Sequence, residues 1–198
     1  VIGSALALAV VASVGLVAQD RAAALRAVIA RGKSPEHPTK YVPPPGEQIG
    51  VMLVQSQIAR VTGSYEQALA IAQAVLARDP DPAQRASALR TTAICHHRLG
   101  QTEAAIAEIE LALAIERQRG DLYATALLQF DLGVCFEATG QLRRAEEFYA
   151  LADAYWATIG NAGLRAVSAN SRGVVQHLAG RYRDAHATFA TAIEYARL

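Results

Sequence analysis

The sequence predicts an all-α solenoid of about four antiparallel helix pairs, preceded by a further helical segment. Four glycines that are each followed five residues later by alanine lie 37, 40 and 40 residues apart. A fixed period in this range is typical of stacked helical repeats. Apolar residues make up 52% of the 198 residues, and no alternating Val or Ile run predicts a strand. The pairs are Gly63/Ala68, Gly100/Ala105, Gly140/Ala145 and Gly180/Ala185.

The repeat is clearest in residues 132–152, which predict a helix, a tight turn at Gly140 and a second helix folding back. Glycine suits the turn because it adopts positive φ at little cost. Ala145 is placed where two antiparallel helices approach closely, and Tyr149 and Ala152 continue its helical face. The predicted helices cover 49–62, 64–78, 84–99, 102–118, 121–139, 142–158, 162–179 and 182–197. Gly120 and Gly160 are expected to end two of them.

These residues resemble the tetratricopeptide repeat (TPR). Leu132 and Gly133 match the Leu-Gly pair of its first helix, and Phe136 matches its aromatic position. Gly140, Ala145, Tyr149 and Ala152 match its second helix, and Pro80 matches its closing proline. The sequence departs from the family in period, which exceeds the usual ~34 residues. It also lacks the family's tryptophan, whose places hold Met52, Leu89, Gln129 and Ala169.

The longer repeat is similar to those of large bacterial regulators of the maltose-activator (MalT-like) type and of related signalling ATPases. The resemblance covers about residues 49–198 and implies a right-handed solenoid.

Residues 1–31 are predicted to form an apolar helical segment. Residues 1–19 carry no charge, and about 20 such residues can span a bilayer. We favour a degenerate first repeat in a cytoplasmic protein, with residues 21–31 as the partner helix. A membrane anchor is the alternative. A signal peptide is not favoured, because no basic residue precedes the apolar stretch.

Residues 32–48 are predicted to be a linker, because they hold five of the seven prolines. That density disrupts regular helix and favours an extended connector. A polyproline ligand at residues 42–45 is the alternative. The repeat domain then occupies residues 49–198.

No catalytic or metal-binding constellation is predicted, so we expect no enzyme activity, no cofactor and no metal. Residues 32–34, Gly-Lys-Ser, look like the end of a phosphate-binding loop. However, Ala27 stands where the first glycine is needed, and Pro35 blocks the helix that should follow. His96 and His97 are adjacent, so they point to different sides of a helix and cannot chelate together. A net charge of +1 does not favour direct nucleic-acid binding.

Two other groups of residues are predicted to be structural. Cys95 and Cys135 occupy the same place in successive repeats, farther apart than the ~7 Å disulfide limit. They are expected to be small buried side chains in a reducing compartment. The charged residues at 143, 144, 146 and 147 are expected to form a solvated helix face.

The TPR resemblance implies a binding groove lined by the first helix of each pair. One level of the groove holds Arg90, Phe130 and Asn170, and a second level two turns on holds Arg60, His97, Glu137 and His177. This mixed chemistry suits a peptide or protein segment better than one anionic ligand. The alternative for each residue is simple solvation of the surface.

The sequence therefore predicts a non-catalytic interaction or effector-sensing module of a bacterial transcriptional or signalling regulator. A membrane-anchored scaffold is one alternative. Self-association, as a homodimer through exposed terminal repeats, is another.

Overall fold

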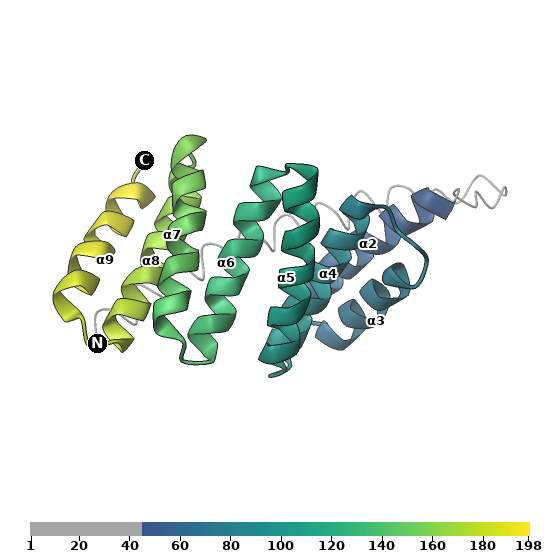
Figure 1. The fold of residues 1–198 in the computed structure, drawn as a ribbon, viewed down its shortest axis with the longest axis horizontal. Coiled ribbons are helices and arrows are strands. Elements are labelled where there is room, and N and C mark those ends of the chain that lie inside the picture. The colour runs from purple at the N-terminus through teal and green to yellow at the C-terminus, as the bar shows by residue number, and fades with distance from the viewer. Residues whose placement is uncertain (1–44) are drawn as a thin grey trace. The chain divides into compact units, whose positions relative to one another are not determined.

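The computed structural model describes residues 45–198, with side chains from residue 48 onward. Within that range the chain forms eight α-helices and no strand (Figure 1). The helices are α2 (Pro45–Val61), α3 (Tyr65–Leu76), α4 (Pro82–Arg98), α5 (Thr102–Arg119), α6 (Leu122–Ala138), α7 (Leu142–Thr158), α8 (Ala162–Leu178) and α9 (Tyr182–Ala196). The predicted segment 1–31, the phosphate-loop candidate at 32–34 and most of the predicted linker lie outside the described residues.

The chain divides into two compact units, one ending at Cys95 and the other comprising His96–Leu198. In the first unit α2 packs against α3. Its core includes a cluster of Ile49, Leu53, Val75 and Ala88. In the second unit each helix packs against the next, from α5 through α9 (Figure 1). The second unit contains most of the residues that were predicted to bind a partner.

Each predicted turn glycine lies at a helix reversal and has a positive φ. The values are 83° at Gly63, 82° at Gly100, 74° at Gly140 and 76° at Gly180. Gly120, with φ 72°, caps the C-terminus of α5 as expected. These reversals produce antiparallel helix pairs, and the predicted all-α solenoid class is confirmed.

The helix starts follow from side-chain caps and from proline. Asp121 Oδ1 accepts a hydrogen bond from Ala124 N at 2.9 Å, and Asn161 Oδ1 accepts one from Leu164 N at 3.0 Å. These bonds satisfy backbone donors that a helix start leaves free. Helix α2 begins at Pro45, earlier than the predicted start at residue 49. Proline fits a first helical turn, where its missing N–H would have no partner anyway.

Two glycines lie directly against an aromatic ring of the partner helix. A Cβ built on Gly133 would lie 2.6 Å from the Tyr149 ring, and one built on Gly173 would lie 2.6 Å from the Phe189 ring. Ala145, at the predicted close approach, is fully buried. Small residues on one helix thus make room for a large ring on its partner.

One pair of repeat positions, twelve residues apart, holds three different contacts in successive repeats. His96 Nδ1 lies 2.8 Å from Glu108 Oε2. Forty residues on, the rings of Phe136 and Phe148 stack at 5.4 Å. Forty residues further, Thr188 Oγ1 donates to Gln176 Oε1 at 2.8 Å. The backbone geometry repeats while the contact changes from imidazole–carboxylate to aromatic stacking to a hydroxyl–amide hydrogen bond.

Candidate functional site

The side chains of α6 divide into a buried arc and a more exposed arc. Leu128, Leu132 and Phe136 are each 1% exposed. The opposite arc carries residues spaced by three or four positions, which share one helical face. It consists of Tyr123, Leu127, Phe130, Val134 and Glu137, all of which retain solvent contact.

The same arc exists on α8, forty residues later. It consists of Val167, Asn170, Val174 and His177. The residue that follows this arc, Leu178, is 58% exposed. The two arcs make up the candidate groove of the second unit.

Apolar residues separate the two predicted levels, and sequence reasoning missed them. Val134 and Val174 lie between the level of Phe130 and Asn170 and the level of Glu137 and His177. Both valines retain partial exposure. The signal was available, because each lies four residues after a predicted groove residue and the two are one repeat apart. The surface is therefore more apolar than the predicted residues alone imply.

Phe130 and Glu137 are both fixed by Tyr149 of α7. The Phe130 and Tyr149 ring centroids are 5.1 Å apart, and the Tyr149 hydroxyl donates to Glu137 Oε2 at 2.8 Å. Burial raises the pKa of the Glu137 carboxyl, and the hydrogen bond from Tyr149 offsets only part of that rise. Tyr149 also hydrogen-bonds with Ser171 of α8. Glu137 is thus a partly buried acceptor engaged within the fold, not a solvated carboxylate.

The two predicted groove histidines have different surroundings. His97 is half-buried, and its Nδ1 lies 3.4 Å from Thr102 Oγ1. Burial, followed by the charge of Arg98, lowers the pKa of His97, and Asp131 opposes this shift. His97 is therefore neutral at neutral pH. His177 is exposed, and its ring meets that of Tyr182 edge-on at 5.1 Å.

The other predicted groove residues are only partly brought together. Phe130, Glu137, Asn170 and His177 lie on the two arcs of the second unit, and His97 belongs to the same unit. Arg60 and Arg90 are half-buried residues of the first unit, on α2 and α4. A single groove containing all seven residues stays a prediction.

The charged residues near the start of α7 are not all solvated. The pair of Arg143 and Glu147 is exposed, as predicted, with side chains 92% and 58% accessible. The Glu146 side chain is only 21% accessible and bonds to residues of the following repeat. Arg144 lies over the Phe136 ring, 3.8 Å from its centroid. The predicted solvated face is therefore wrong for Glu146, because its partners lie thirty or more residues away.

Both cysteines lie in the helical core of the described chain. Cys95 and Cys135 are buried free thiols, and burial raises the pKa of Cys135 to about 12. Between residues 45 and 198, no three His, Cys, Asp or Glu residues gather so that they could hold a metal ion. No helix of this range is long and apolar enough to cross a membrane.

Comparison with known proteins gives a likeness of fold. No protein family and no curated protein matches the chain. Among solved structures, BtubC from P. vanneervenii matches with a TM-score of 0.67 and 18% identity, covering 92% of this chain and 72% of that one. Apo RapI matches with a TM-score of 0.73 and 16% identity, covering 88% and 62%.

A third structure carries the name of the repeat. A kinesin-light-chain-type protein of Podosopora anserina with nearly identical TPR-like repeats matches with a TM-score of 0.59 and 17% identity, covering 90% of this chain and 87% of that one. The fold is a TPR-like helical repeat. The chain spans less than two thirds of RapI.

Proposed function

We propose that this chain is a non-catalytic module that binds a protein or peptide segment across the candidate groove. One observation carries the proposal. Half-exposed apolar residues, Val134 on α6 and Val174 on α8, recur between polar and aromatic residues at matching repeat positions. Such a surface offers apolar contact area together with groups that fix the register of a bound segment.

The rigidity of the surface supports the same proposal. Phe130 is held against Tyr149, and Tyr149 is itself bonded to Glu137 and Ser171. Side chains fixed before binding lose little conformational freedom when a partner arrives. Phe130 and Glu137 would therefore need little rearrangement to receive a bound segment.

We infer that the module serves a bacterial transcriptional or signalling regulator. The support is the sequence resemblance to MalT-like repeats, together with their longer period. In that setting a bound segment or effector would change how the repeats pack against neighbouring domains.

The test is selection of binders from a displayed library of short linear peptides, followed by titration of the best peptide. Asn170→Arg and His177→Glu are expected to weaken binding about tenfold or more, since each places a new charge in the groove. His186→Glu is the matched control for His177→Glu, because it makes the same exchange at an exposed position on α9. Thermal melting checks that all three variants fold.

Two outcomes would contradict the proposal. One is that the selected peptides keep their affinity for both groove variants. The other is that the library yields no peptide that binds above the bare support.

A further inference from the structure

The buried arc of α8 differs in chemistry from the corresponding arc of α6. On α6 it consists of Leu128, Leu132 and Phe136. Forty residues on, Ser168, Arg172 and Gln176 occupy the same positions of α8. Ser168 is fully buried and Gln176 is 5% exposed. The apolar side chains that fill this position in one repeat are thus polar in the next.

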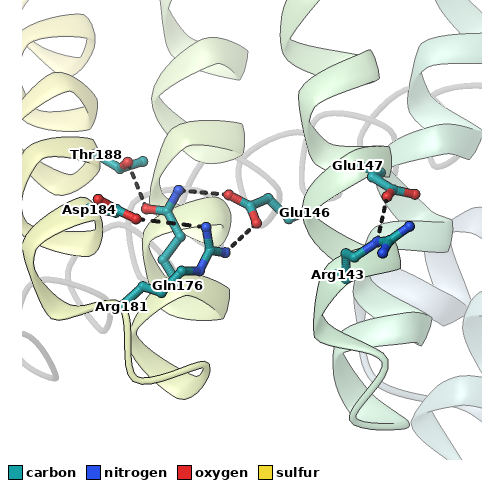
Figure 2. Close-up of polar contacts among 7 residues, drawn as sticks. All are labelled: Arg143, Glu146, Glu147, Gln176, Arg181, Asp184 and Thr188. Carbon is teal, nitrogen blue, oxygen red and sulfur yellow. Dashed lines mark hydrogen bonds and ion pairs between the residues drawn. The ribbon is translucent and has the colours of Figure 1, made fainter.

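A polar network joins α7 to α8 and α9 at the turn end of these helices (Figure 2). Gln176 Nε2 donates to Glu146 Oε1 at 2.7 Å, and Gln176 Oε1 accepts from Thr188. Arg181, in the turn between α8 and α9, donates to Glu146 Oε2 and also pairs with Asp184 at 3.8 Å. Among the residues drawn in Figure 2, Glu146 is the only one from α7 that bonds to α8 or to the turn after it.

A second polar contact joins the same helices toward their other end. Arg165 Nε of α8 donates to Asp153 Oδ1 of α7 at 3.2 Å. The Arg165 guanidinium also donates to the Tyr195 hydroxyl of α9 at 2.5 Å and lies 4.0 Å above that ring. Leu164 adds an apolar contact here, packing against the cluster that contains Trp156.

The buried arc of α8 also contains polar atoms for which the described residues supply no hydrogen-bond partner. These are Ser168 Oγ and Arg172 Nε. Such atoms weaken a packed junction, because they lose water on burial and gain no bond in return. By contrast, α8 and α9 fit tightly, since Phe189 fills the space beside Gly173.

We propose that the α7–α8 junction is a polar latch, from which the α8–α9 hairpin opens as one unit while α5, α6 and α7 stay packed. Opening it exchanges the ionic and amide contacts of Glu146 and Asp153 for contacts with water. It also separates Leu164 from the apolar cluster that contains Trp156. The hairpin stays intact because Gly173/Phe189, Gln176/Thr188 and Arg165/Tyr195 hold its two helices together. If the proposed function holds, opening would also move Asn170 and His177 away from Phe130, and so regulate the groove.

Native-state amide hydrogen exchange of the full chain tests the latch. Amides of α8 and α9 are expected to exchange through a shared opening that is easier than that of α6 and α7. Salt should favour this opening as it rises from about 0.01 to about 1 M, where the Debye length falls from ~30 to ~3 Å. Exchange at one common rate and salt dependence from α6 to α9 would overturn the proposal.

Glu146→Gln isolates the latch, since it removes the charge and keeps the shape. It should speed exchange in α8 and α9 roughly tenfold or more, because a hydrogen-bonded charge is lost, and leave α6 unchanged. Glu147→Gln is the matched control, since Glu147 pairs only with exposed Arg143 among the residues in Figure 2. Equal effects of the two substitutions would contradict the latch.

The opposite test strengthens the junction, by replacing its residues with those at the corresponding positions of the preceding repeat. Ile106, Leu128, Leu132, Phe136 and Phe148 are the counterparts of five positions at the junction. The transplanted variant carries E146I, S168L, R172L, Q176F and T188F. It should slow exchange of α8 and α9 about tenfold or more. It should also reduce the salt dependence of that exchange, leaving only the part that comes from the Arg165–Asp153 pair. Unchanged exchange in a folded variant would sink the proposal, and it would do so whether or not the groove binds peptides.

Discussion

At the scale of single residues, one missing methyl group decides how two helices meet. Gly133 faces the Tyr149 ring, and a Cβ there would come within 2.6 Å of it. We expect Gly133→Ala to destabilise the protein, because overpacking costs ~1–3 kcal/mol while alanine returns up to ~1 kcal/mol in helix propensity. Gly50→Ala is the control, since nothing lies within 4 Å of its Cβ and only the propensity gain applies. Urea unfolding measures both.

Tyr149, the ring that faces Gly133, offers a compensating change. The preceding repeat has Ala93 and Ile109 at the matching positions. We therefore expect Gly133→Ala and Tyr149→Ile together to cost less than the sum of the two single changes, with coupling of ~0.5–3 kcal/mol. Additive costs in the double-mutant cycle would show that the contact between residues 133 and 149 is not what makes Gly133→Ala destabilising.

Two carboxylates of the second unit are expected to affect stability in opposite directions. Burial raises the pKa of Glu137, and the hydrogen bond from Tyr149 only partly offsets it. The contribution of Glu137 to folding stability is therefore most favourable at pH values below its unfolded-state pKa of about 4.3. That contribution is lost as the pH rises through its folded-state pKa. Glu137→Gln keeps an acceptor for Tyr149 and should raise the melting temperature at pH 7. The gain should vanish near pH 3.

The pKa of Glu146 is shifted in the opposite direction. Burial alone would raise its pKa, but hydrogen bonds from Arg181 and Gln176 and the charges of Arg181 and Arg172 hold it below the usual value. The stabilising contribution of Glu146 is present at pH values above its unfolded-state pKa of about 4.3. It is lost as the pH falls through the folded-state pKa. Glu146→Gln should lower the melting temperature at pH 7, with little effect at low pH. Parallel pH profiles for the two variants would refute both assignments.

At the scale of the helix, local signals largely determine where elements begin and end. Turn glycines and capping residues can be identified without knowing any neighbour in space, and the predicted helices agree closely with the observed ones. We expect Asp121→Ala to cost ~0.5–2 kcal/mol, because its carboxylate caps α6 at Ala124 N. Gln101→Ala at the start of α5 should cost little, since that side chain makes no capping bond. Thermal or urea unfolding compares the two.

The candidate groove was less predictable than the helices that carry it. Phe130 and Glu137 could be placed on one face from their spacing. Their attachment to Tyr149 could not, because that contact depends on how closely α6 and α7 pack at Gly133. The partners of Glu146 also depend on a helix that follows thirty residues later. Burial of a charged residue is set by such distant partners, and local charge patterns do not contain them.

At the scale of the whole molecule, charge and repetition are the properties that the sequence gives directly. The chain has 19 basic and 18 acidic residues, so no net field draws it to a polyanion. We expect binding to a labelled DNA duplex weaker than about 10⁻⁴ M at ~0.15 M salt, the weak limit for non-specific binders. Fluorescence anisotropy measures it. A salt-dependent curve in the micromolar range would contradict this expectation.

The division into two units was not predicted, because the repeat pattern runs through it without interruption. The boundary after Cys95 lies inside α4, where the sequence shows no linker, proline or charge run. Repeats stabilise mainly their neighbours. Local differences in packing between neighbours therefore decide where one compact unit ends and the next begins, and the glycine register does not report those differences.

The glycine that accepts a ring also restricts how this protein can evolve. A lineage that replaces Gly133 before Tyr149 passes through a crowded intermediate, whereas one that first shrinks the tyrosine passes through a loosely packed one. Marginally stable proteins tolerate few such steps. The order in which a repeat exchanges its glycine–aromatic pair for an alanine–aliphatic pair, and not only the identity of the substitutions, is therefore constrained.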